Sequence, residues 1–549
     1  MADLPVRPLV SRLYMADAFG ESRLRRYMFT PESTFFASES AIYGRNVSCQ
    51  SSKSAIHKAD TLKNELIVVW PESGAQSETK RASRFIPPFS VDVMARWRYL
   101  AVTRRNVFKT RAAFHTVLSA PYDGAGNVNS KRKKEEGDMG QLDSGNAAWI
   151  LTSASLVFLM TPGVAFFYGG MVRAKAVLNM MIMEAAALSV TMVIWVLWGW
   201  SIAYAGTSVG GVFTSASLNS NNYPVSVDVA FQSAFAMITV ALICGAIAER
   251  VKYSTWMIFV ALWITFDYAP LAHMVWNGGL LSADGAISQA IGAAAHDFAG
   301  GTVVHINAAV AALVIVLIIG KRKGFGTQPF RPHNVPFVML GAFLLWFGWF
   351  GFNAGSAFAA NGTAGYAWVS TSAATAAAML SWGFTEKIRT GHYTAMGAAS
   401  GIVAGLVAIT PAADVVSPLW AIVLGAIAGV LTCLACGLKF KLGYDDSLDV
   451  VGVHGVGGFT GTVLIGFFGE GTGLFAGGDW KQLVVQLIVA LVAIIWSAVV
   501  TGIIAFALEK TIGWRVTEAQ EVGGIDLADQ GERAYDFAGT ASSVLKEVK

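Results

Sequence analysis

The sequence predicts an all-α membrane protein with eleven transmembrane helices. Apolar residues make up 54% of the 549 positions and charged residues only 14%, whereas soluble proteins carry roughly 25% charged residues. From Trp149 onward the chain consists of apolar runs separated by short polar breaks, and each run is close to the ~20 residues that cross a bilayer. The runs are rich in Gly, Ala, Ser and Thr, which allow helices to pack closely in lipid.

Residues 1–138 are predicted to lie outside the membrane domain. They hold 22 Lys and Arg against 14 Asp and Glu, whereas residues 139–549 hold 18 against 22. No apolar run here is long enough to span a bilayer, and no apolar core follows the early positive charges as it would in a signal peptide. We expect a disordered extension or a misassigned start, with natural translation beginning at Met139. A genuine extra segment is the alternative.

The eleven predicted spans fill a membrane domain at 139–510. They cover residues 147–169, 177–205, 228–248, 254–275, 299–320, 335–357, 366–385, 393–410, 418–437, 450–469 and 482–508. The remaining residues, 511–549, form a mixed-charge tail that is too short for an added enzyme domain.

The orientation follows from the positive charges in the short loops, because Lys and Arg favour the cytoplasmic side. The loops after odd-numbered spans contain Arg173, Lys175, Arg250, Lys252, Lys321, Arg322, Lys323, Arg331, Lys387, Arg389, Lys439, Lys441, Lys510 and Arg515. The loops after even-numbered spans contain only Lys481. The N-terminus of the first span is therefore predicted to lie outside and the C-terminus in the cytoplasm.

Two histidines lie in equivalent contexts five spans apart. His305 follows Asp297 and two glycines in span five, and His454 follows Asp449 in span ten. Because five is odd, two consecutive five-helix units would have opposite orientations, and such inverted repeats place a shared site near the membrane midplane. Neutral imidazole offers one donor and one acceptor and titrates near neutral pH. The pair is therefore predicted to line a polar path or to carry a proton, whereas a single histidine would be read as helix packing.

Other chemistries find little support in the sequence. The Cys433-Leu-Ala-Cys436 spacing lies in an apolar stretch without His or carboxylate neighbours and is interpreted as helix packing. No His-Glu-x-x-His motif is present, and we predict no enzyme activity, no cofactor and no metal. The basic run at 131–134 has no aromatic platform around it, which argues against nucleic-acid binding.

Four segments resemble the signature sequences of the ammonium transporter family, the ammonium/methylammonium permeases related to the Rhesus proteins. These are His273-Met-Val-Trp276, Asp297-Phe-Ala-Gly-Gly-Thr-Val-Val-His305-Ile-Asn, Gly348-Trp-Phe-Gly-Phe-Asn-Ala-Gly-Ser356 and Val453-His454-Gly-Val. The resemblance runs in order from about Asn146 to Tyr535 and covers all eleven spans and the tail. It implies an ammonium transporter of the cell membrane, with methylammonium as a surrogate substrate.

The resemblance also implies which residues form the pathway. They are Trp276, Phe235 and Ser356 for ammonium recruitment, Phe231 and Phe352 or its neighbours as a gate of two stacked rings, His305 and His454 as the pore lining and proton relay, and Asp297 as an acid that orders the outer site. Aromatic faces hold cations, by about 2 kcal/mol or more once water is removed. Taken singly, Trp276 would be read as an interfacial residue and the phenylalanines as packing.

The resemblance implies a homotrimer with one pore per subunit and a PII-type signal protein on the cytoplasmic face. Two mechanisms stay open, electrogenic ammonium uptake with a proton on the histidines and passage of neutral ammonia. An ammonium sensor and a carbon dioxide channel are further alternatives. Asp267 and Gln530 depart from the family pattern. Asp267 would alter the affinity for ammonium or simply face its neighbours. Gln530 puts regulation by the tail in question.

Overall fold

The computed structural model describes residues 143–204 and 223–535, and within these ranges the chain forms helices and no β-strand. The all-helical prediction is confirmed for this part of the chain. The predicted extension at 1–138 and the end of the tail lie outside the described residues.

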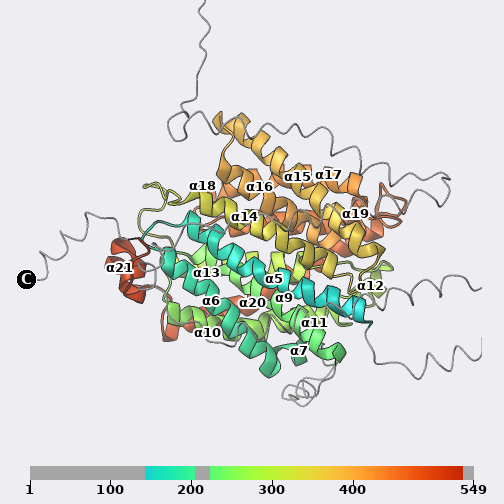
Figure 1. Cartoon of the computed structure of the whole chain (residues 1–549), viewed down its shortest axis with the longest axis horizontal. Helices are drawn as coiled ribbons and strands as arrows, with labels where there is room; N and C mark the ends of the chain where they lie inside the picture. The colour runs from blue at the N-terminus through green and yellow to red at the C-terminus, as the bar shows by residue number, and fades with distance from the viewer. Residues whose placement is uncertain (1–142, 205–222, 536–549) are drawn as a thin grey trace, which may run out of the picture. The chain divides into compact units, whose positions relative to one another are not determined.

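The helices carry the labels of Figure 1. In chain order they are α5 (Ser144–Met171), α6 (Val177–Ile194), η4 (Trp195–Gly199), α7 (Trp200–Tyr204), α9 (Tyr223–Ile247), α10 (Tyr253–Trp263), η6 (Ile264–Tyr268), α11 (Ala269–Trp276), α12 (Ala286–Ile291), η7 (Gly301–Ile306), α13 (Asn307–Ile319), α14 (Val335–Trp349), η8 (Phe350–Ala354), α15 (Gly362–Thr390), α16 (Ala395–Ile409), η9 (Thr410–Ala412), α17 (Pro418–Cys436), α18 (Leu438–Leu442), η10 (Val451–Gly455), α19 (Val456–Phe468), α20 (Trp480–Thr511), α21 (Glu518–Gly523) and η11 (Asp526–Gln530).

Ten helical segments in the described ranges are long and apolar enough to cross a membrane. Ten of the eleven predicted spans coincide with them. The predicted span at 366–385 falls within α15, which is 29 residues long but contains many Ser, Thr and Gly residues and ends in charged residues. Its composition therefore leaves it outside the set of ten.

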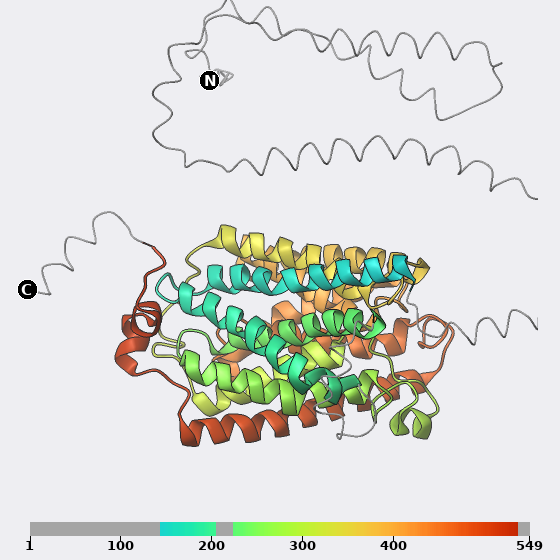
Figure 2. The ribbon, with the colours of Figure 1, turned by 60° about the horizontal axis from the view of Figure 1, so that its bottom comes forward.

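The long helices run along a common direction and pack side by side, as both views of the described part show (Figures 1 and 2). The most extensive packing joins α15 with α17, α5 with α14, and α15 with α16. Glycines allow the closest approaches. A Cβ on Gly425 of α17 would lie 2.1 Å from the carbonyl oxygen of Ala374 of α15, so this helix pair tolerates only glycine there.

Buried ion pairs tie together the loops at the end of the bundle where α18 lies. The guanidinium of Arg322 lies 2.9 Å from a carboxylate oxygen of Asp445 and 3.3 Å from one of Glu249, which also pairs with Arg173 at 2.8 Å. Arg250 is fully buried, and its guanidinium donates to the carbonyl oxygen of Asp445. These contacts join the loops after α5, α9, α13 and α18.

The described part of the tail is docked on the same end. Asp526 accepts hydrogen bonds from the backbone N–H groups of Leu178 and Asn179 at 3.1 and 2.8 Å, and Asp529 accepts one from Tyr253 at 3.2 Å. The first residues of α6 and α10 have no cap from their own preceding side chains. The tail carboxylates therefore satisfy orphan donors at two helix N-termini, where negative charge is favoured.

Candidate functional site

A cavity of about 280 Å³ lies between α9, the end of α11 and the turn after η8. Its lining consists of Tyr204, Asp228, Phe231, Gln232, Phe235, Trp276, Phe298, Ser356 and Phe358. Four residues that sequence reasoning assigned to recruitment and gating therefore meet here, although up to 125 positions separate them along the chain. We call this space the recruitment cavity.

Hydrogen bonds fix the polar groups at this cavity. The indole Nε1 of Trp276 donates to the carbonyl oxygen of Asp297 at 2.8 Å, and the hydroxyl of Ser356 donates to the carbonyl oxygen of Phe352 at 2.8 Å. Because the serine proton is committed to that carbonyl, the lone pairs of its oxygen remain available as acceptors. The cavity thus combines aromatic faces with an oriented acceptor, which suits a small cation that carries N–H donors.

The aromatic stack beneath the cavity differs from the predicted pair. Phe352 stacks on Phe235, with ring centroids 4.2 Å apart and planes 28° apart. Phe231 instead meets Phe235 edge-on at 4.8 Å and Phe358 edge-on at 5.3 Å. Phe231 precedes Phe235 by about one helical turn of α9, and η8 places Phe352 at the level of Phe235. The prediction that Phe231 stacks on Phe352 is therefore wrong.

Asp297 is a structural acid. One carboxylate oxygen accepts from the N–H groups of Gly300 and Gly301 at 2.8 and 2.6 Å, and the other accepts from the N–H of Thr302 at 2.8 Å and from its hydroxyl. Both oxygens are thus used to cap the start of η7. Asp297 is only 8% exposed and does not line the recruitment cavity, and its backbone carbonyl is the group that accepts from Trp276.

Beyond the stack, His305 and His454 lie side by side. Their Nδ1 atoms are 3.3 Å apart and their ring centroids 5.3 Å apart. His305 also stacks on Trp349 at 5.5 Å and on Phe352 at 6.1 Å. The cavity they line measures only about 10 Å³ and is otherwise bordered mainly by apolar side chains, so it admits about one water molecule. The Nε2 of His305 has no hydrogen-bond partner among the described residues.

Each histidine sits in a π-helical turn, His305 in η7 and His454 in η10. Such turns occur mostly as single insertions at functional sites. Each turn starts a helix that continues as α13 or α19, so the two imidazoles project from the beginnings of two packed helices.

The acid whose hydrogen bonding is similar to that of Asp297 is Asp446 and not Asp449. Asp446 accepts a hydrogen bond from the N–H of Val451 at 2.7 Å and so caps η10, whereas Asp449 pairs with Lys439 at 2.7 Å. His305 lies eight positions after Asp297, and His454 lies eight positions after Asp446. This equal spacing in the sequence could have indicated Asp446, but Asp449 lies closer to His454 and was chosen instead.

Several cavity residues escaped sequence reasoning. Tyr168 and Trp349 border the histidines, while Phe298 and Phe358 border the recruitment cavity. They come from four different segments, and their apolar surroundings make them look like packing residues. Phe298 and Trp349 carried a signal, because each lies within one of the four motif segments.

The two departures from the family pattern lie away from both cavities. Asp267 is fully buried in η6 and accepts from the hydroxyl of Thr501 in α20 at 3.3 Å, so it faces neighbouring helices. Gln530 lies at the end of η11, and its amide donates to Asp529 at 3.3 Å.

Cys433 and Cys436 are free thiols, and within the described residues no group of three or more His, Cys, Asp and Glu side chains could hold a metal ion.

Residues 148–535 match the model of the Ammonium Transporter Family. The ammonium transporter of Mycobacterium tuberculosis (strain ATCC 25618 / H37Rv) is 50% identical over 448 residues, which cover 74% of this chain and 93% of that protein. The ammonium transporter of Aquifex aeolicus is 45% identical over 413 residues, covering 72% and 95%.

Solved structures give the same result. A sensor Amt protein superposes with a TM-score of 0.65 at 28% identity and covers 70% of this chain and 98% of its own. Saccharomyces cerevisiae Mep2 gives a TM-score of 0.61 at 32% identity and covers 69% and 88%. Together with the ten apolar helices, these matches place the protein in the cell membrane as a multi-pass protein. The chain belongs to the ammonium transporter family.

Proposed function

We propose that the protein takes up ammonium by binding the ion in the recruitment cavity, removing its proton there and passing ammonia along His305 and His454. The observation that carries the proposal is the sequence of sites along one path. An aromatic cavity with an oriented serine oxygen is followed by the Phe235–Phe352 stack and then by a narrow cavity that holds the two imidazoles.

Recruitment depends on groups that favour a cation with N–H donors. The faces of Trp276 and Phe235 attract positive charge, and the oxygen of Ser356 accepts a hydrogen bond. Asp228 also lines the cavity, where it accepts from the indole N–H of Trp200 at 2.7 Å. We assign the gate to the stacked rings of Phe235 and Phe352, whose displacement opens the way to the histidines.

Deprotonation follows from the cost of desolvation. A bare ion entering a cavity of about 10 Å³ with mainly apolar walls would lose nearly all of its water, and charges without partners are very unfavourable in such surroundings. Neutral ammonia enters at much lower cost. The 3.3 Å Nδ1–Nδ1 contact lets one imidazole donate to the other, so the released proton has a route and the net event moves one positive charge.

The membrane arrangement completes the proposal. We count α15 as an eleventh span, because its 29 residues give a length of about 43 Å, and we keep the orientation with the first span starting outside and the tail in the cytoplasm. The matching capped π-turns at His305 and His454 support an inverted five-helix repeat. The membrane domain then covers 139–510 and the cytoplasmic tail 511–549.

We also propose a homotrimer and a PII-type partner at the cytoplasmic face. The trimer rests on family resemblance. The proposed binding surface for this partner includes the end of the bundle where Asp526 and Asp529 attach the tail. A sensing role is the second candidate function, and the similarity to a sensor Amt protein favours it over a gas channel.

Replacing Trp276 with leucine tests the recruitment cavity. We expect the half-saturating concentration of methylammonium to rise about twofold to thirtyfold, because the loss of a cation–π contact costs about 0.5 to 2 kcal/mol. Uptake into proteoliposomes provides the measurement. Trp480→Leu is the matched control, since Trp480 is 60% exposed at the start of α20. An equal change in both variants would contradict the assignment.

The histidine route is tested by current on a supported membrane after an ammonium pulse. We compare the wild-type protein with the double variant His305→Ala, His454→Ala, and expect a wild-type current that the double variant loses. His392→Ala is the control, because His392 is exposed between α15 and α16. A wild type that passes ammonia without current would sink the electrogenic mechanism, and one that passes neither would leave the sensing role.

A further inference from the structure

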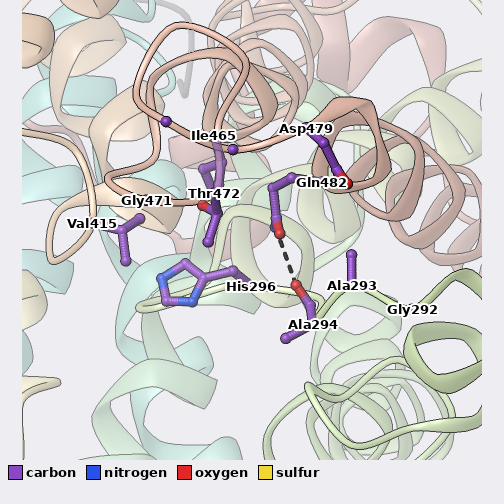
Figure 3. A pocket seen from close by; sticks show the side chains of 12 residues that line it. Gly292, Ala293, Ala294, His296, Val415, Ile465, Gly471, Thr472, Asp479 and Gln482 are labelled. Atoms are coloured by element: carbon purple, nitrogen blue, oxygen red, sulfur yellow. Dashed lines mark hydrogen bonds between the residues drawn. The ribbon is translucent and has the colours of Figure 1, made fainter.

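A second pocket of about 500 Å³ lies beside the segment that leads into η7 (Figure 3). It is lined by Gly292, Ala293, Ala294, His296, Val415, Ile465, Gly471, Thr472, Gly477, Gly478, Asp479 and Gln482. In Figure 3 the ring of His296 lies below Thr472 and between Val415 and Ala294, while the amide of Gln482 reaches the carbonyl oxygen of Ala294. The transport path described above does not include this pocket.

His296 forms an ion pair at the edge of this pocket. Its Nε2 lies 2.8 Å from a carboxylate oxygen of Asp414, and the two side chains are 29% and 16% exposed. Asp414 belongs to the turn between η9 and α17, so the pair joins the start of the His305 segment to that turn. Asp414 also lies close enough to Tyr366 to act on it electrostatically, and the hydroxyl of Tyr366 donates to Glu470 at 2.7 Å.

The same segment supports the recruitment cavity. The backbone N–H and carbonyl of His296 are both held by the side-chain amide of Gln486, at 2.9 and 2.7 Å. The next residue, Asp297, provides the carbonyl that accepts the indole N–H of Trp276. Phe298 follows and places its ring in the cavity wall. A shift at His296 would therefore move two groups that shape the cavity.

Protonation of His296 is favoured by its surroundings. Burial lowers the pKa of His296, but the hydrogen bond to Asp414 and the charges of Asp414 and Asp297 outweigh burial and raise that pKa above its ordinary value. The charged or titratable groups on the packed elements are Asp414, Asp297, Asp479, Lys481, Glu470 and Tyr366. Four of these six groups are carboxylates, so the local field favours the imidazolium.

We propose that His296 and Asp414 are a pH-dependent pair of positioning residues for ammonium recruitment, an inference that rests on the proposed function. The paired imidazolium holds residues 296–298 so that Trp276 and Phe298 close around the ion. As pH rises through the pKa of His296, the neutral ring keeps one N–H that can still bond Asp414, but the attraction between opposite charges is lost. The segment then loosens and ammonium binds less tightly.

The sign of the effect is fixed by this chemistry. A raised histidine pKa means that the charged pair is complete below the ordinary value of about 6.5 and is lost as pH rises through the raised value. We expect the half-saturating concentration of methylammonium to rise about fivefold from about pH 5.5 to about pH 8.5. A partly exposed ion pair contributes up to about 1 kcal/mol, which corresponds to about a fivefold change in an equilibrium constant. The maximal rate should not follow the same curve.

The test measures labelled methylammonium uptake by the full-length protein in proteoliposomes with equal pH on both sides. His296→Gln should give a high half-saturating concentration at every pH, whereas His296→Lys, which keeps the charge, should give a low one at every pH. Asp414→Asn should resemble His296→Gln. The control is His392→Gln, which should keep the wild-type curve.

Two results separate this inference from the proposed function. A His296→Gln variant that keeps the wild-type pH dependence would overturn the pair while leaving ammonium uptake intact. A wild type without saturable uptake would overturn the proposed function and the inference together. Elution of each variant at the wild-type position in size-exclusion chromatography excludes misfolding, and a pH-independent, low half-saturating concentration in His296→Lys would support the pair directly.

Discussion

Asp297→Asn is expected to reduce transport to less than about one tenth of the wild-type rate. The carboxylate of Asp297 accepts from four consecutive backbone N–H groups and from the hydroxyl of Thr302. In asparagine an NH₂ group replaces one carboxylate oxygen and cannot accept a hydrogen bond from the backbone N–H groups. At least one buried N–H would then be unpaired, which costs about 1 to 3 kcal/mol of stability. The start of η7 would shift, and His305 and the carbonyl that holds Trp276 would move with it. Methylammonium uptake checks the result.

Asp479→Asn is the matched control for this substitution. Asp479 caps α20 through one hydrogen bond to the N–H of Lys481 at 2.8 Å, and asparagine caps helices about as well as aspartate. We expect uptake close to that of the wild type. Equal uptake by the two variants would show that the carboxylate of Asp297 does not organise the site.

Asp445→Asn is expected to destabilise the protein by about 3 to 5 kcal/mol, the cost of breaking a buried ion pair from one side. Asp445 is 1% exposed and pairs with Arg322 through both carboxylate oxygens, at 2.9 Å each. The fully buried guanidinium of Arg250 lies 3.8 Å away. Without the carboxylate, two buried positive charges lose a counter-ion, and the midpoint of thermal unfolding in detergent should fall.

The pH dependence of the same variant gives an independent check. Burial raises the pKa of Asp445, but the hydrogen bonds and charge of Arg322, followed by the charge of Arg250, lower it by more. Its stabilisation is therefore present above the ordinary pKa of about 3.9 and is lost as pH falls through the lowered value. The gap between wild type and variant should close in strong acid. Asp284→Asn, at an exposed position, should leave stability unchanged at every pH, and an unaltered midpoint for Asp445→Asn would contradict the argument.

Much of the fold could be predicted because apolar run length reports directly on membrane helices. The limits of ten runs coincide with helices that can cross a membrane. α15 is less apolar than the other ten segments, because it carries small and hydroxyl residues in place of large apolar ones where it packs on α17. The π-helical turns at His305 and His454 could not be predicted, since one extra residue in a turn changes no compositional pattern.

The site shows the same division. Motif resemblance selected Trp276, Phe235, Ser356 and the two histidines, and the structure brings these residues to two neighbouring cavities. Motif resemblance could not select whether Phe231 or Phe235 stacks on Phe352, because residues four apart on one helix share a face. That choice depends on depth along α9, which only the packing against η8 determines. The ion pair of His296 was hidden for a similar reason, since its partner lies 118 positions away.

The central claim is that ammonium is recruited as an ion and that its proton and ammonia both cross the membrane. The most direct measurement records labelled methylammonium uptake and current on the same proteoliposome preparation. We predict about one positive charge for each methylammonium at every membrane potential, with a rate that responds to the potential as expected for a transported charge, about 2.3 kcal/mol per 100 mV. Saturable uptake without any current would contradict the account and identify the protein as a conduit for the neutral molecule.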